Sequence, residues 1–117
     1  WICTTHLQSG GKRSEGVRTS QILTIDSTLE AFHGERLVLT GDFNICSHEL
    51  EELKGIDAQK LAWLLQKHQL VDVNRGLGDT MECRKDFIFQ RGLNLEFASI
   101  KTDVLSDRPL ITASFQN

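Results

Sequence analysis

Residues 37–44 of the chain read Leu-Val-Leu-Thr-Gly-Asp-Phe-Asn, an apolar run that ends in a glycine, an aspartate and, two positions later, an asparagine. The apolar run predicts a buried strand. Because alternate residues of a strand point to the same face, Asp42 and Asn44 are expected to lie together, with Phe43 directed into the core. A carboxylate beside a carboxamide at a strand end suits the binding of a metal, a water or a phosphate. The alternative interpretation is an ordinary polar turn after a strand.

Three other segments carry polar side chains at the ends of strand-like runs. Residues 2–8 (ICTTHLQ) end on a histidine and a glutamine, residues 85–92 (KDFIFQRG) open with a Lys-Asp pair, and residues 105–110 read LSDRPL. In this order the four segments resemble the C-terminal half of the endonuclease/exonuclease/phosphatase superfamily. That group includes DNase I-like nucleases, abasic-site endonucleases, inositol-polyphosphate 5-phosphatases and neutral sphingomyelinases.

Composition places few limits on this interpretation. A chain of 117 residues with 39% hydrophobic and 25% charged residues is typical of one globular domain or part of one. No apolar run approaches the roughly 18 residues of a membrane-spanning helix, so no transmembrane segment is expected. The net charge of −3 gives no general electrostatic support for binding a long polyanion such as DNA. The sequence predicts no particular compartment.

The spacing of apolar residues predicts alternating strands and helices. Strands are expected at 1–7, 36–43, 86–91, 94–101 and 110–115, with a short extended segment at 71–74. Helices are expected at 17–32, ended by Gly34, and from Asp57 to about His68, with loops at 8–16, 48–55 and 76–83. The strands flanking Gly92 are expected to pair as a hairpin. The predicted fold is α/β, with a mixed β-sheet and flanking helices. The resemblance implies half of a four-layer α/β/β/α sandwich of the DNase I-like type, with residues 1–117 as the C-terminal part of the domain and the N-terminal half absent.

The resemblance implies catalytic roles for three residues at strand ends. His6 would donate to a phosphate oxygen or to the leaving group. Asp42 would orient or deprotonate the attacking water, or bind a metal. Asn44 would bind the substrate by donating to the phosphoryl oxygens, where charge builds in the transition state.

A departure from the family pattern occurs at Arg108. The family motif is Ser-Asp-His, whose Asp binds metal and whose His acts as general base or phosphate contact, but this chain has Arg108 after Asp107. Asp86 matches the residue that holds this histidine in the family; the alternative is a strand-edge aspartate in a solvent salt bridge with Lys85 or Arg84. A guanidinium stays protonated and cannot act as a general base, although it can bind a phosphate. Arg108 is therefore expected to pair with Asp86, which would leave the site shaped but poorly catalytic.

A second departure concerns the metal. In the family a metal-binding glutamate and a phosphate-site asparagine come from the N-terminal half. The chain is thus expected to supply only part of a Mg²⁺ or Mn²⁺ site, through Asp42 and Asp107. The acidic residues Glu49, Glu51 and Glu52 are interpreted as a solvated loop. A sheet face left uncovered would favour a dimer or a partner chain.

Two further residues are predicted to bind substrate. Gln8 follows His6 on the same strand face, and Arg18 lies near the expected start of a helix, where anions are favoured. In sphingomyelinase-like members an arginine and a glutamine often follow the Thr-His-Leu-Gln segment in this way. The alternative for Arg18 is an ordinary helix-surface residue.

The cysteines and the remaining histidines match no motif. Three cysteines make an odd number without zinc-like spacing, so at least one thiol is unpaired and all are interpreted as buried or partly buried. A bridge between Cys3 and Cys46 is one alternative. The remaining histidines are interpreted as surface residues: His33, His48 and His68.

Together these residues predict a divalent-metal-dependent phosphoester hydrolase that is impaired in this chain. A sphingomyelinase-like phosphodiesterase acting on a phospholipid head group is the first choice, followed by a nuclease acting on nucleic acid and then by an inositol-phosphate phosphatase. The alternatives are a non-catalytic module that binds a phosphate ligand or a protein, and a fragment without independent function.

Overall fold

The structure is a computed structural model that describes residues 1–77, 83–101 and 108–116. Asp107, the predicted metal ligand, lies outside these residues, as does Ser106 of the same motif. Within the described part of the chain, no helix combines the length and the apolar character needed to cross a membrane.

A four-stranded mixed sheet forms the centre of the fold. Its strands are β1 (Ile2–His6), β2 (Leu37–Asp42), β4 (Asp86–Arg91) and β3 (Val71–Asp72), in that spatial order. β1 and β2 run parallel, whereas β4 is antiparallel to both β2 and β3. The prediction of a mixed sheet is confirmed, and β1 and β3 are its edge strands.

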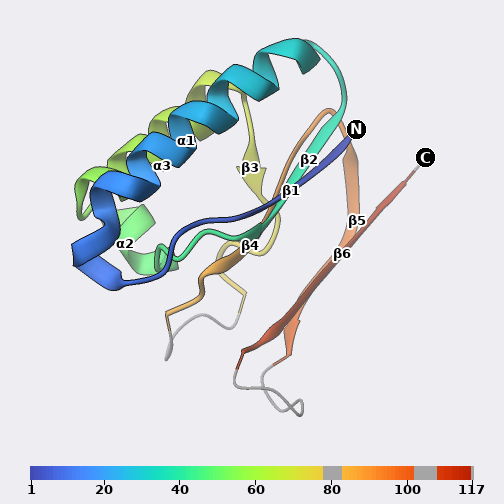
Figure 1. Cartoon of the computed structure of the whole chain (residues 1–117). Coiled ribbons are helices and arrows are strands. Elements are labelled where there is room, and N and C mark those ends of the chain that lie inside the picture. Colours follow the sequence, from blue (N-terminus) through green and yellow to red (C-terminus); the bar gives the residue numbers. More distant parts are fainter. Residues whose placement is uncertain (78–82, 102–107, 117) are drawn as a thin grey trace.

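Two long helices cover one face of this sheet. The chain passes through a short 3₁₀ turn, η1 (Gly11–Ser14), into α1 (Glu15–Leu29), which continues as the 3₁₀ turn η2 (Glu30–Phe32). The other long helix, α3 (Ile56–Lys67), lies beside α1 (Figure 1). Both helices agree with the prediction to within a few residues.

A third helix, α2 (Ser47–Glu52), occupies the segment for which the sequence predicts an acidic loop, and that prediction is wrong. Leu50 packs against the hydrophobic core, whereas Glu51 and Glu52 face solvent. Leu53 caps the C-terminal end of the helix, with a φ of 56° in the left-handed region.

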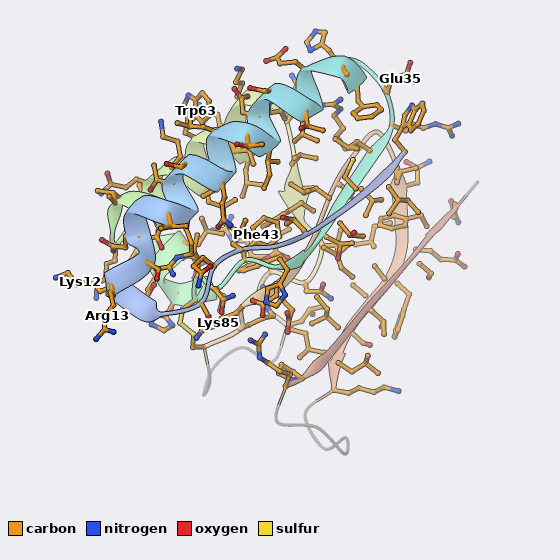
Figure 2. All side chains as sticks on the ribbon, in the orientation of Figure 1. Lys12, Arg13, Glu35, Phe43, Trp63 and Lys85 are labelled. Carbon is orange, nitrogen blue, oxygen red and sulfur yellow. A yellow bond between two sulfur atoms is a disulfide. The ribbon has the colours of Figure 1, made fainter. Side chains whose placement is uncertain are left out.

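Three phenylalanine rings fill the space between the sheet and the helices. Phe43, Phe87 and Phe89 are fully buried, and their ring centroids lie 5.0 to 5.8 Å apart. Figure 2 shows Phe43 between the helical layer and the strands. The prediction that Phe43 points into the core is confirmed, and this cluster anchors the end of β2 that carries Asp42.

The last two strands, β5 (Asn94–Lys101) and β6 (Leu110–Gln116), pair with each other in a separate antiparallel sheet. The hairpin predicted between residues 86–91 and 94–101 is therefore wrong. The turn at Gly92, with a φ of 75°, carries the chain from one sheet to the other. The β5–β6 ribbon lies on the side of the central sheet away from the helices (Figure 1).

A buried histidine joins α1 to the end of α3. His68 is 3% exposed, and its Nε2 lies 2.7 Å from Oδ1 of Asp26. The ammonium of Lys67 lies 2.9 Å from a carboxylate oxygen of Asp26 and 2.9 Å from one of Glu30. The interpretation of His68 as a surface residue is wrong, because its ring is buried and contacts the carboxylate of Asp26.

This cluster predicts a loss of stability in acid. The hydrogen bond from His68, followed by the bond from Lys67, holds the pKa of Asp26 below its ordinary value of 3.8. The folded chain therefore keeps Asp26 ionised at a pH where the unfolded chain binds a proton. This stabilisation is complete above the unfolded pKa and is lost as the pH falls through the lower, folded value. The free energy of unfolding of Asp26→Asn should thus approach that of the unmodified chain below pH 3.8 in chemical denaturation. A difference that persists undiminished in acid would contradict this prediction.

Candidate active site

Strand pairing places three of the predicted residues in one row at the end of the central sheet. His6 of β1 is the register partner of Asp42 of β2, and Asp42 is in turn the partner of Asp86 of β4. These residues come from segments far apart in the sequence, yet the hydrogen-bond register alone makes them neighbours. Nε2 of His6 lies 3.4 Å from Oδ2 of Asp42.

The Arg108 guanidinium connects the two carboxylates of this row. Its Nη2 donates to Oδ2 of Asp42 at 2.8 Å, and its Nη1 donates to both carboxylate oxygens of Asp86 at 3.0 Å. The expected pairing of Arg108 with Asp86 is confirmed, and the contact with Asp42 is an addition that the sequence did not indicate. The hydrogen bond to Asp42 is the largest cause that raises the pKa of Arg108, so the guanidinium is a permanent cation.

Asn44 takes part in the turn that follows β2. Its backbone N–H donates to Oδ1 of Asp42 at 2.9 Å, and its Nδ2 donates to the carbonyl oxygen of Leu7 at 2.7 Å. With a φ of 51°, Asn44 has left the extended conformation, so the alternation expected along a strand does not set its direction. Its side chain instead fastens the end of β2 to the segment after β1.

The described carboxylates do not fit a divalent cation in this arrangement. Both oxygens of Asp42 accept hydrogen bonds, one from Asn44 and one from Arg108. Both oxygens of Asp86 accept from the same guanidinium. A Mg²⁺ or Mn²⁺ ion needs such oxygens as ligands and would be repelled by the positive charge between them. The guanidinium thus engages the carboxylate oxygens that a metal would need as ligands.

Arg84 is buried beside the row, whereas the sequence suggested it only as an alternative, solvent-exposed partner of Asp86. It is 2% exposed, its Nη2 donates to Oδ2 of Asp72 at 2.7 Å, and its Nη1 donates to the carbonyl oxygen of Asp86 at 3.1 Å. Its guanidinium also lies 4.6 Å from the ring centroid of Phe87. The sequence offered one signal, an arginine two residues before Asp86, but nothing in it placed Asp72 nearby. Arg84 fixes the strand end that presents Asp86.

A cavity of about 620 Å³ lies on the far side of Arg84, between α2, α3 and β3. Leu50, Leu65 and Phe87 form part of its apolar wall. The residues that join at Asp42 do not line this cavity, and their side chains range from 74% exposed at His6 to 17% at Asp42 and 25% at Asp86.

The structure corrects the prediction that Arg18 contacts substrate. Arg18 is 2% exposed, and its Nε donates to Oδ2 of the equally buried Asp57 at 2.7 Å. Its other nitrogens donate to the carbonyl oxygens of Gln8, at 2.9 Å, and of Gly11. These bonds leave Arg18 inside the protein, where it secures the loop after β1 to α3. Gln8 itself is exposed beyond His6, and its contact with substrate stays a prediction.

Comparisons with known proteins bear on the fold of the chain. No protein-family model matches it, and no curated protein matches it. Among solved structures, a crystal structure of TDP2 from D. rerio, humanized by 14 mutations, matches with a TM-score of 0.64 and 21% identity. The match covers 99% of this chain and 55% of that one, so the chain spans about half the length of the solved protein. The chain therefore shares the mixed α/β architecture of that protein and is consistent with part of a DNase I-like fold.

Proposed function

We propose that this chain carries the phosphoester site of a hydrolase, of phosphodiesterase type, in which Arg108 suppresses turnover. One observation supports the proposal most strongly. His6, Asp42 and Asp86 align across three neighbouring strands at one end of the sheet. The guanidinium of Arg108 lies between the two carboxylates. Each of the three side chains is one that phosphoester hydrolysis uses, and each came from a separate motif.

Each residue of the site can take a different role in phosphoester hydrolysis. His6, with its side chain 74% exposed, can donate a proton to a phosphate oxygen or a leaving group. Asp42 can orient an attacking water once Arg108 no longer holds its Oδ2. The Nδ2 group of Asn44 has a second hydrogen, which can reach a phosphoryl oxygen while the first stays on Leu7. Arg108 can bind the phosphate itself, although it cannot accept the proton of the water.

The substrate class is a separate proposal. A phospholipid head group, as in sphingomyelinase-like enzymes, a nucleic-acid phosphodiester and an inositol phosphate are the three candidates. The overall charge of −3 weighs against a long polyanion and favours a small head group. Parallel assays of hydrolysis of a choline phosphodiester, a short oligonucleotide and an inositol polyphosphate would rank the three candidate substrate classes.

Substitution of Arg108 by histidine is expected to produce or raise hydrolysis of a chromogenic phosphodiester by about 10²-fold. This is the lower end of what a general base contributes. The reason is that an imidazole between Asp42 and Asp86 can take the water proton, and its smaller charge frees both carboxylates. Turnover of bis(p-nitrophenyl) phosphate, with and without Mg²⁺ or Mn²⁺, measures the effect on both chains.

The matched control is Arg75→His, because Arg75 is an exposed arginine paired with Glu51 outside the site. It should leave the rate unchanged. Equal or faster turnover by the unmodified chain would show that Arg108 does not suppress catalysis. Absence of turnover in both folded chains would count against the hydrolase and favour the second candidate.

The second candidate is a module that binds a phosphate ligand without turnover. The observation that favours it is the permanent charge of Arg108, whose side chain is 40% exposed at the open end of the sheet. Calorimetric titration with phenyl phosphate should then detect binding to the unmodified chain and loss of binding in Arg108→Met. A protein partner in place of a phosphate ligand would give no signal in this titration.

We also propose that a further protein surface covers the β5–β6 ribbon. Leu95, Phe97 and Leu110 of this ribbon are exposed by 44%, 61% and 48% of their surface. The match to about half of a longer solved chain supports the other half of such a domain as the cover, and a dimer is the competing arrangement. Sedimentation of the chain alone distinguishes the two arrangements, because only a dimer would give an apparent mass that rises with the concentration of the chain.

A further inference from the structure

Metal-ligating side chains gather in two places outside the candidate active site, within the described ranges. One group is Asp26, Glu30 and His68, and the other is Cys46, His48 and Glu49. In the first group the ammonium of Lys67 bonds to both carboxylates and occupies the place of a cation. The second group differs because it contains a sulfur ligand, and that sulfur is bonded to a second cysteine.

The second group has nearly the size of a zinc site. The ligand atoms of Cys46, His48 and Glu49 all lie within 4.8 Å of one another. In a tetrahedral zinc site, bonds of about 2.0–2.3 Å place the ligand atoms roughly 3.5 Å apart. His48 is exposed and Glu49 is half-buried, so small rotations of their side chains can close this difference.

The disulfide supplies the fourth ligand. Cys46 is bonded to Cys83, with the two Cα atoms 4.8 Å apart, although 37 positions separate them in the sequence. While the disulfide is intact, neither sulfur is a thiolate, and only the thiolate is a good zinc ligand. Reduction therefore adds two soft ligands at one position beside His48 and Glu49.

We propose that Cys46, Cys83, His48 and Glu49 form a site that becomes able to bind zinc when the disulfide is reduced. A dithiol reductant supplies two electrons and two protons, breaks the sulfur–sulfur bond to give two thiols, and becomes a disulfide itself. One Zn²⁺ then binds both sulfurs as thiolates and releases their two protons. Two thiolates, one imidazole and one carboxylate select zinc over magnesium, because Mg²⁺ prefers oxygen ligands alone.

The site would preserve a crosslink that supports the candidate active site. Cys46 follows the turn at Asn44, and Cys83 precedes the strand of Asp86. The two segments are already joined by backbone bonds, from Ser47 N–H to the Arg84 carbonyl at 2.8 Å and from Phe43 N–H to the Lys85 carbonyl at 2.9 Å. A disulfide holds them together under oxidising conditions, and zinc would do so under reducing conditions.

Cobalt titration of the full chain tests this proposal. Cys3, the unpaired thiol among the described residues, is first replaced by serine so that only Cys46 and Cys83 can supply thiolates. After reduction with dithiothreitol and anaerobic removal of the reductant, Co²⁺ should bind one per chain, with the visible bands of a tetrahedral ion and thiolate charge-transfer absorption. Zn²⁺ should displace it. The oxidised chain should show neither signal.

Side-chain variants distinguish a site with all four ligands from one in which only the two cysteine sulfurs bind zinc. His48→Ala and Glu49→Gln should each weaken zinc binding roughly a hundredfold in competition with a chromogenic chelator, since loss of even an outer partner costs 10–100-fold. His33→Ala removes another exposed histidine and should have no effect. Zinc binding to the reduced chain no tighter than to the oxidised chain would overturn the site. Unchanged affinity in both His48→Ala and Glu49→Gln would overturn the four-ligand assignment. Neither result depends on hydrolase activity.

Discussion

Substitution of Arg18 by methionine is expected to lower the free energy of unfolding by about 3–5 kcal/mol, the cost of breaking a buried ion pair by removing one partner. Arg18 and Asp57 are each 2% exposed, and Nε of Arg18 lies 2.7 Å from Oδ2 of Asp57. Methionine fills much of the same volume but leaves the Asp57 carboxylate buried without a cation. It also removes the donors to the carbonyls of Gln8 and Gly11. Urea denaturation followed by circular dichroism measures the loss.

The matched control for Arg18 is Arg13→Met. Arg13 is exposed and points away from the body of the protein (Figure 2), so its loss should change stability by less than about 0.5 kcal/mol. The double substitution Arg18→Met with Asp57→Leu should recover much of the stability, because no buried charge then lacks a partner. A loss below about 1 kcal/mol in Arg18→Met would mean that water reaches Asp57 and that the pair is not truly buried.

The buried position of Arg18 shows why a local sequence pattern could not assign its role. Its neighbours in sequence form a polar loop and a helix start, a setting that suits an anion site. Its actual partner, Asp57, lies 39 positions later at the start of another helix. Only the packing of α1 against α3 makes Arg18 and Asp57 neighbours, and no periodic pattern in the sequence indicates that contact.

The strands and long helices were predictable because their signals are local. An apolar run ending at Gly41 predicts β2 whatever surrounds it, and apolar residues in helical spacing predict α1 and α3. The partner of β4 was not predictable in this way. A glycine turn between two strand-like runs usually favours a hairpin, but here β4 pairs with β2 and β3, and β5 pairs with β6. Competition between long-range partners decided that pairing.

The candidate site was predictable where chemistry constrained it. The resemblance placed Arg108 beside Asp86, an ion pair was then expected from charge alone, and the structure contains it. The second contact of Arg108, with Asp42, depends on the register that aligns β2 with β4. The pairing of Cys46 with Cys83 was equally hidden, because three cysteines allow several connectivities and spacing does not choose among them.

Substitution of Gly41 by alanine is expected to lower the free energy of unfolding by about 3 kcal/mol or more. Gly41 has a φ of 142°, a conformation that costs an L-residue about 1–3 kcal/mol. In addition, an added Cβ would collide with the carbonyl oxygen of Thr5, its register partner on β1. Backbone cannot yield as a flexible side chain can, so β1 must separate from β2 at this point and lose hydrogen bonds worth about 0.5–1.5 kcal/mol each. Thermal and urea denaturation would report the loss.

Gly34→Ala isolates the collision from the backbone strain. Gly34 also has a positive φ, 78°, but nothing lies within 4 Å of the position that a Cβ would take. Alanine there should cost only the strain, about 1–2 kcal/mol. Equal losses at the two glycines would refute the collision. A larger loss at Gly41 would tie the glycine of the Gly-Asp-Phe-Asn turn to the approach of β1, because the same strand contact that excludes a side chain at Gly41 sets His6 beside Asp42.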